Sequence, residues 1–160
     1  MTMPEGPRAK VMRPGEGRYV VIGERARCTF KVVGAETGGR FGLFEYVMEP
    51  KAEGAAPHVH HELTEIFYVA DGEVELVLGG TRQVAPRGSL MLVPPETVHG
   101  FSNASDGRST LLIMFCPAGE RELYFEGMAE LTRDGRVPSR AELLDLMRRF
   151  DQEPVEVGPK

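Results

Sequence analysis

The histidines are the residues of this chain whose types and spacing suggest chemistry. His58, His60 and His61 lie close together in the sequence, and His99 follows much later. Side chains at i and i+2 of a strand point to the same side, so His58 and His60 share one face and His61 faces away. Glu65 follows at the start of the next expected strand. Three imidazoles and one carboxylate suit a single divalent transition metal ion, which could be Fe, Mn, Co, Ni, Cu or Zn.

These four side chains must be brought together by strands that are separate in the sequence. From Arg18 to Cys116, short apolar or alternating runs follow one another, divided by turn sequences such as Gly38-Gly39, Asp71-Gly72 and Pro94-Pro95. Such a rhythm of short strands and turns is typical of a β-sandwich or a β-barrel. A closed barrel can direct side chains of several strands toward one interior point, and we therefore expect an all-β fold.

The sequence predicts three parts. Residues 1–17 contain three prolines and no apolar core, which indicates a flexible N-terminal arm. Residues 18–116 are expected to form the barrel. Residues 117–160 are expected to form a helical extension with two helices, over residues 120–132 and 139–150, because apolar residues recur there at helical spacing. Ser139 and Glu142 form a capping-box pattern at the start of the second helix.

The two histidine-bearing segments resemble the two motifs of the cupin superfamily. The run His58-x-His60-x4-Glu65-x6-Gly72 is similar to the first motif, and the run Gly88-x5-Pro94-x4-His99-x3-Asn103 is similar to the second. The resemblance implies a single-domain cupin, which is a double-stranded β-helix or jelly-roll barrel, followed here by two C-terminal α-helices. It also implies that His58, His60, Glu65 and His99 are the metal ligands.

Two positions depart from these motifs. Ala52 stands where the first motif has glycine, although Gly54 is near, and Glu96 replaces the glycine after Pro94-Pro95. We expect the turn at Glu96 to avoid a left-handed residue, as a type I turn does. Neither change affects a ligand, so the departures concern loop geometry and not metal binding.

The layout of one barrel followed by two helices also resembles bacterial quercetinase-like single-domain cupins. Known members of that group are dioxygenases that open flavonols. The resemblance implies an enzyme that acts on a small phenolic or enolisable substrate with O2, with Glu65 as ligand and base. Two alternatives stay open: a non-oxidative metal-dependent isomerase, cyclase, decarboxylase or hydrolase, and a cupin that binds a small molecule without catalysis.

Apolar side chains near the expected ligands are candidates for a substrate pocket. Alternation places Phe67 on the side of Glu65 and Phe101 on the side of His99. The remaining candidates could line the same space or simply form the core. The complete candidate set is Phe44, Tyr46, Met48, Phe67, Phe101 and Met114.

Charge and hydropathy exclude some classes of partner. The net charge is −5 and no basic stripe occurs, so we expect no nucleic acid partner. No apolar run approaches the roughly 20 residues of a membrane span, and we expect a cytoplasmic protein without a membrane partner. Twofold dimers are the commonest oligomers, so we expect a homodimer, with the N-terminal arm and residues 18–22 as candidate contacts.

Overall fold

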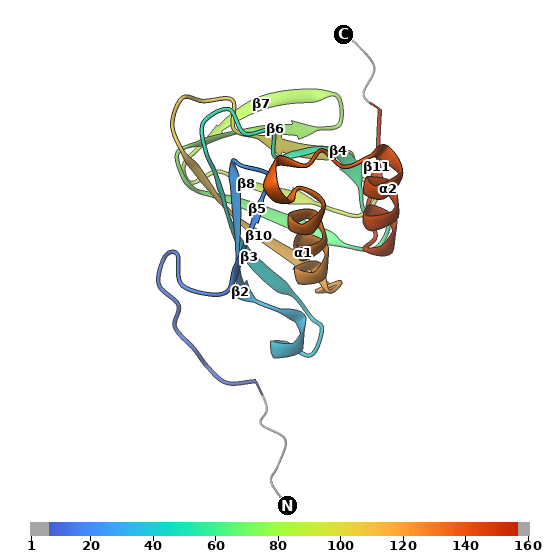
Figure 1. Cartoon of the computed structure of the whole chain (residues 1–160). Helices are drawn as coiled ribbons and strands as arrows, with labels where there is room; N and C mark the ends of the chain where they lie inside the picture. Colours follow the sequence, from blue (N-terminus) through green and yellow to red (C-terminus); the bar gives the residue numbers. More distant parts are fainter. Residues whose placement is uncertain (1–6, 157–160) are drawn as a thin grey trace, which may run out of the picture.

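Two antiparallel β-sheets face each other in the computed structural model, which describes residues 7–156 (Figure 1). The first sheet has the order β1 (Tyr19–Ile22), β2 (Ala26–Val32), β3 (Gly42–Met48), β10 (Ser109–Cys116), β5 (Thr64–Asp71) and β8 (Leu90–Val93). The second has the order β11 (Glu153–Pro154), β4 (Ala55–Val59), β9 (His99–Ser102), β6 (Glu73–Leu78) and β7 (Thr81–Pro86). The all-β jelly roll predicted from the sequence is confirmed, but its two sheets do not close into one continuous barrel.

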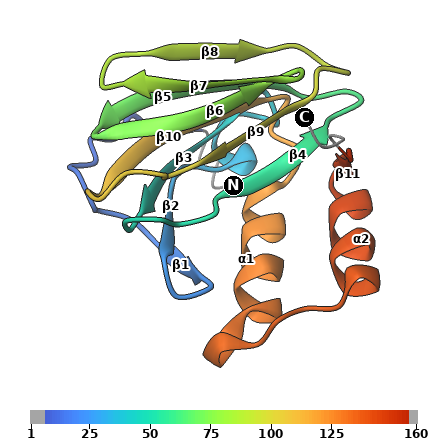
Figure 2. The ribbon, with the colours of Figure 1, turned by 90° about the horizontal axis from the view of Figure 1, so that it is seen from above.

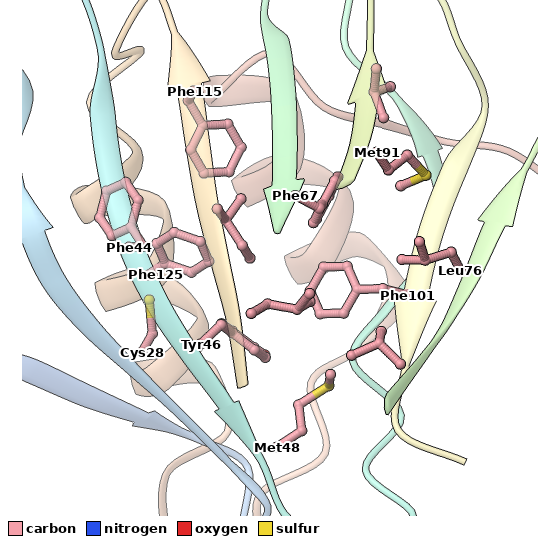
Figure 3. Packing of buried hydrophobic residues seen from close by; sticks show 14 of the residues in the cluster. Cys28, Phe44, Tyr46, Met48, Phe67, Leu76, Met91, Phe101, Phe115 and Phe125 are labelled. Atoms are coloured by element: carbon pink, nitrogen blue, oxygen red, sulfur yellow. The ribbon is translucent and has the colours of Figure 1, made fainter. Parts of the chain in front are cut away.

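Side-chain alternation explains why the strands fold in this register. In β3, Phe44, Tyr46 and Met48 are buried, while the residues between them are only half buried. In β10, which pairs with both β3 and β5, Leu111, Ile113 and Phe115 form the buried face. The inward side chains of the two sheets meet in one core, part of which Figure 3 shows.

Two helices follow the last long strand, as the sequence predicts. They are α1 (Arg121–Leu131) and α2 (Arg140–Arg149), with short 3-10 turns η1 (Gly34–Glu36) and η2 (Arg133–Gly135) elsewhere. The capping box is present, because the Ser139 hydroxyl accepts from Glu142 N at 3.2 Å and the Glu142 carboxylate accepts from Ser139 N at 2.8 Å. No helix in residues 7–156 is long and apolar enough to cross a membrane.

The helices cover one end of the space between the sheets (Figure 2). Phe125 of α1 reaches into the core, and its ring centroid lies 4.9 Å from that of Phe44 and 6.1 Å from that of Phe115. Leu146 of α2 is buried against Gly127 of α1. The helix pair is therefore part of the core and not an appendage on the outer surface.

The start of the described chain runs along the first sheet. Lys31 of β2 donates from Nζ to the carbonyl oxygens of Arg13 and Glu16, at 2.9 and 2.7 Å. Residues 1–6 of the expected flexible arm lie outside the described residues. The edge strand β1 has Tyr19 and Val21 about half exposed, and the homodimer contact expected there stays a prediction.

Candidate metal centre and cavity

Three strands bring the four predicted ligands into one buried cluster. His58 lies on β4, Glu65 on β5 and His99 on β9, and His60 directly follows β4. The pairing of β4 with β9 places His58 opposite His99. One potential ligand atom from each of the four residues lies within 4.8 Å of the others, and all four residues are at most 3% exposed. The cluster could hold a metal ion.

The outer nitrogen of each imidazole is held by a backbone carbonyl. Nδ1 lies 2.7 Å from Ala56 O in His58, 2.6 Å from Asp151 O in His60 and 2.8 Å from Thr97 O in His99. A carbonyl oxygen only accepts, so each Nδ1 carries the proton. In a neutral imidazole the lone pair is then on Nε2. Contacts of this kind orient metal-binding histidines in proteins.

The centre of the cluster fits a cation. Glu65 Oε2 lies 2.9 Å from His60 Nε2 and 2.7 Å from His99 Nε2. With both Nε2 atoms unprotonated, two nitrogen lone pairs face one carboxylate oxygen, and a cation among these donor atoms would be attracted to all three. Three imidazole nitrogens and a carboxylate oxygen are the donor set preferred by borderline divalent ions.

Burial and mutual contacts set the protonation states of the cluster. Burial, together with the neighbouring His99, lowers the pKa of His58 to about 3, so His58 is neutral at physiological pH. Burial alone would raise the pKa of Glu65. Its close contacts with the imidazoles of His60 and His99 outweigh that effect, and the net pKa lies well below the usual value. Glu65 is therefore a carboxylate, the form that binds metals.

One residue of the site has no counterpart among the sequence predictions. Asp151 follows α2, and its carboxylate accepts hydrogen bonds from the backbone N–H groups of His61, Glu62 and Leu63. Nothing in the sequence near Asp151 distinguishes it from other acidic residues between elements. Its role depends on a contact between segments about ninety residues apart, of the kind that local patterns do not reveal.

On the exposed side of the same loop, the turn at Glu96 differs from the sequence-based expectation. His61 faces outward, as strand alternation predicts, and its Nδ1 lies 2.8 Å from Glu96 Oε1. Glu96 has φ 64°, so the turn after Pro94-Pro95 does contain a left-handed residue, and the expectation that it avoids one is wrong. The Glu96 N–H donates to His60 O at 2.7 Å, a contact that holds the backbone in this conformation.

Gly54, which lies near the position where the first motif has glycine, has a backbone that requires glycine. It has φ 63°, and a Cβ at this position would lie 2.2 Å from Phe101 O. Only glycine combines this backbone conformation with so close an approach of β9.

A cavity of about 410 Å³ lies between the strands and the two helices. Its volume is in the range of small-molecule pockets, roughly 300–1,000 Å³. Its lining is mostly apolar, and of the four clustered residues His58 and Glu65 line it. A molecule in the cavity would thus meet one side of the candidate metal centre.

The predicted pocket residues divide into three groups. Tyr46 and Phe101 line the cavity, whereas Phe44, Met48 and Phe67 are buried in the core without lining it. Met114 is not in the cavity wall, because alternation along β10 directs Ile113 and Phe115 inward and Met114 to the outer face. The expectation for Met114 is therefore corrected.

The helical part of the cavity wall is absent from the sequence-based pocket. It includes Phe125 and Met128 of α1 and Leu143 and Met147 of α2. Helical periodicity predicts that these side chains form apolar faces, but it does not tell against which part of the protein a face packs.

Arg121 places a buried positive charge at the cavity wall. The residue is 2% exposed, and its guanidinium lies over the ring of Tyr124 at 4.0 Å and that of Phe115 at 4.6 Å. Burial lowers its pKa, but a guanidinium stays charged at neutral pH. Within residues 7–156, Arg121 forms no ion pair with a carboxylate, and its Nε has no hydrogen-bond partner.

Comparison of the sequence with known proteins also indicates a cupin. The model of the family described as "Cupin domain" matches residues 44–115. A quercetin 2,3-dioxygenase of Bacillus subtilis (strain 168) is 31% identical over 102 residues, which are 62% of this chain and 29% of that protein. The chain therefore spans less than a third of the length of this curated relative.

Solved structures with little sequence identity have the same fold. KdgF from Halomonas sp. superposes with a TM-score of 0.60 at 19% identity, over 69% of this chain and 94% of that one. A predicted oxalate decarboxylase from Thermotoga maritima superposes with a TM-score of 0.63 at 15% identity, over 68% of this chain and 99% of that one. The polyketide cyclase RemF from Streptomyces resistomycificus superposes with a TM-score of 0.58 at 20% identity, over 68% of this chain and 80% of that one. At these identities the likeness concerns the fold alone.

Proposed function

We propose that this chain is a cupin and, on that premise, a metal-dependent dioxygenase for a small phenolic or enolisable, flavonol-like compound. The observation that carries the proposal is the apolar cavity that ends at His58 and Glu65. It offers room for an organic molecule directly beside a donor set suited to a transition metal. The 31% identity to a quercetin 2,3-dioxygenase supports the oxidative reaction over the others.

His58, His60 and His99 would hold the ion through Nε2, and Glu65 through a carboxylate oxygen. A bound transition metal supplies Lewis acidity toward a substrate oxygen and, if it is redox-active, a path for electrons between substrate and O2. The three backbone carbonyls at the Nδ1 atoms keep the imidazoles in the tautomer that such binding needs.

The cavity wall would bind the apolar body of the substrate and exclude water. Tyr46 and Phe101 come from the strands and Phe125 from α1, so aromatic rings lie on two sides of the space. Aromatic side chains offer large apolar contacts to a planar substrate. Exclusion of water strengthens the electrostatic interactions at the buried end.

Two charged side chains at the cavity would control the substrate proton. Glu65 is a carboxylate whose pKa lies below the usual value, so it is a weak base, and it would accept the proton of a phenolic or enolic hydroxyl only where that hydroxyl is acidified by a bound metal ion. The buried positive charge of Arg121 favours the anion that results, because opposite charges interact strongly where water is excluded. Both effects favour a substrate that becomes an enolate or phenolate on binding.

The test compares two histidine variants with the wild type. We would measure bound metals by elemental analysis and O2 uptake with flavonols and catechols for the wild type, His99→Ala and His61→Ala. His61 is the matched control, since it is an exposed histidine outside the cluster. We expect about one redox-capable metal per chain and O2 uptake in the wild type and His61→Ala, and the loss of both in His99→Ala.

Other results would contradict parts of the proposal. Bound metal without O2 uptake on any of these substrates would overturn the dioxygenase and favour a non-oxidative isomerase, cyclase or decarboxylase. No metal retained after loading with Fe, Mn, Co, Ni, Cu or Zn would overturn the metal centre. Equal loss of metal in both histidine variants would show that the cluster is not the binding site.

A further inference from the structure

We propose that Asp151, in the turn between α2 and β11, is a positioning residue of the metal centre. The inference rests on the proposed function, because it assumes that the histidine cluster binds a metal. Asp151 lies outside the cluster itself. It would act on the metal through the loop that carries His60, and Asp151 itself is not one of the cupin motif positions in this chain.

Four hydrogen bonds join Asp151 to this loop, which comprises residues 60–63. Its carbonyl oxygen lies 2.6 Å from His60 Nδ1. One carboxylate oxygen accepts from His61 N at 2.7 Å. The other accepts from Glu62 N at 2.9 Å and from Leu63 N at 3.0 Å. A single residue thus fixes the ring of one ligand and three consecutive backbone N–H groups after it.

The loop needs such a partner because of where it lies. It connects β4 to β5, and it begins at the ligand His60 and ends two residues before the ligand Glu65. Three consecutive N–H groups that point the same way cannot be satisfied by the strands on either side, and a carboxylate satisfies all three. A change in the path of residues 61–63 would move Glu65 relative to His60, and so the donor atoms of both.

The turn that carries Asp151 is itself fixed from both sides. Arg121 of α1 donates from Nη1 to Phe150 O at 3.0 Å and from Nη2 to Gln152 Oε1 at 2.8 Å. The Gln152 side-chain amide donates to the Tyr124 hydroxyl at 3.1 Å. The turn is thus attached to α1, part of the cavity wall, while Asp151 is attached to the ligand loop. Asp151 has φ 54°, a conformation that aspartate and asparagine tolerate better than most residues.

Asp151→Asn removes one acceptor oxygen while it preserves size and backbone preference. The side-chain NH2 group cannot accept the N–H groups of the loop, so at least one contact is lost. We expect the affinity for Co²⁺ to fall about 10- to 100-fold, as is usual when a group that orients metal ligands is changed. The visible spectrum of the bound Co²⁺ should change as well, since it reports the arrangement of the ligands.

Two controls separate this effect from a general loss of stability. Asp145→Asn makes the same chemical change on the exposed face of α2, where Asp145 pairs with Arg149. Leu146→Ala removes a buried side chain between the helices that does not line the cavity. We would measure Co²⁺ affinity by competition with a chelator, the Co²⁺ spectrum, the apoprotein melting temperature, and amide exchange at Glu62 and Leu63.

The expected pattern is specific to Asp151→Asn. This variant should lose Co²⁺ affinity, change the spectrum and exchange faster at Glu62 and Leu63, while Leu146→Ala lowers the melting temperature with the wild-type spectrum. Wild-type affinity and spectrum in Asp151→Asn would overturn this inference and leave the metal centre intact. The same spectral change in Leu146→Ala would also overturn it. A wild type that binds no Co²⁺ or other divalent metal would overturn the metal centre and this inference together.

Discussion

The buried imidazole of His58 makes the metal-free protein sensitive to acid. His58 is 3% exposed, and burial with the neighbouring His99 lowers its pKa to about 3. In the unfolded chain the pKa of a histidine is about 6.5. The unfolded state therefore binds a proton that the folded state does not, at every pH between these two values.

The sign and the size of the effect follow from this difference. A pKa lowered on folding gives stability that is present above pH 6.5 and is lost as the pH falls toward 3. Each pH unit within this window changes the free energy of unfolding by about 1.4 kcal/mol, so the fall from pH 7.5 to pH 5 costs about 2 kcal/mol from His58 alone. Glu65 contributes little in this range, because its pKa is lowered from a value that is already acidic.

Urea unfolding of metal-free protein at pH 7.5 and pH 5 measures this effect. The comparison is between the wild type and His58→Gln, which keeps a polar side chain but does not titrate. The quantity compared is the difference between the two pH values within each protein, so a lower stability of the variant at both pH values does not matter. We expect the wild type to lose about 2 kcal/mol more than the variant on acidification. Equal losses in the two proteins would refute the claim that His58 is buried as a neutral imidazole.

Two further predictions concern the backbone around the site. Gly54→Ala should lower the free energy of unfolding by at least about 2 kcal/mol in urea titrations, because a left-handed alanine is strained and its Cβ would displace the Phe101 carbonyl. A variant as stable as the wild type would show that Gly54 and β9 lie further apart than the structure has them. Ser139→Ala should lower it by about 1 kcal/mol through loss of the cap on α2. A much larger loss would mean that Ser139 has a role beyond the capping box.

The clustering of the four candidate ligands and the positions of the strands could be predicted because the patterns that indicate them are local in the sequence. The alternation of β3 and the turn sequences between strands determine inward faces within a few residues. The spacing of His58 and His60 places both on one face, and the cupin motifs add Glu65 and His99 at fixed offsets. For these residues the sequence contains most of what is needed to position the donor atoms.

The conformation of the loops was harder to predict from the sequence, because it depends on contacts between residues that are far apart in the chain. Glu96 adopts a left-handed conformation that residue type alone disfavours, and a hydrogen bond to His60 O holds it there. Gly54 allows the close approach of β9, which the sequence around it does not reveal. At Glu96 a tertiary contact thus overrides the local preference, whereas at Gly54 the close approach of β9 requires a residue whose own preference fits.

The wall of the cavity comes from two parts of the chain that are far apart in the sequence. The donor set lies on the strands, whereas much of the opposite wall comes from α1 and α2, far along the sequence from the motifs. Arg121 and the Asp151 turn belong to this C-terminal part as well. Chains that share the four ligands but differ in the helices would keep the same metal chemistry and offer it to different molecules. In the proposed function, the motifs predict the chemistry of the centre, and the C-terminal helices would select the molecule that reaches it.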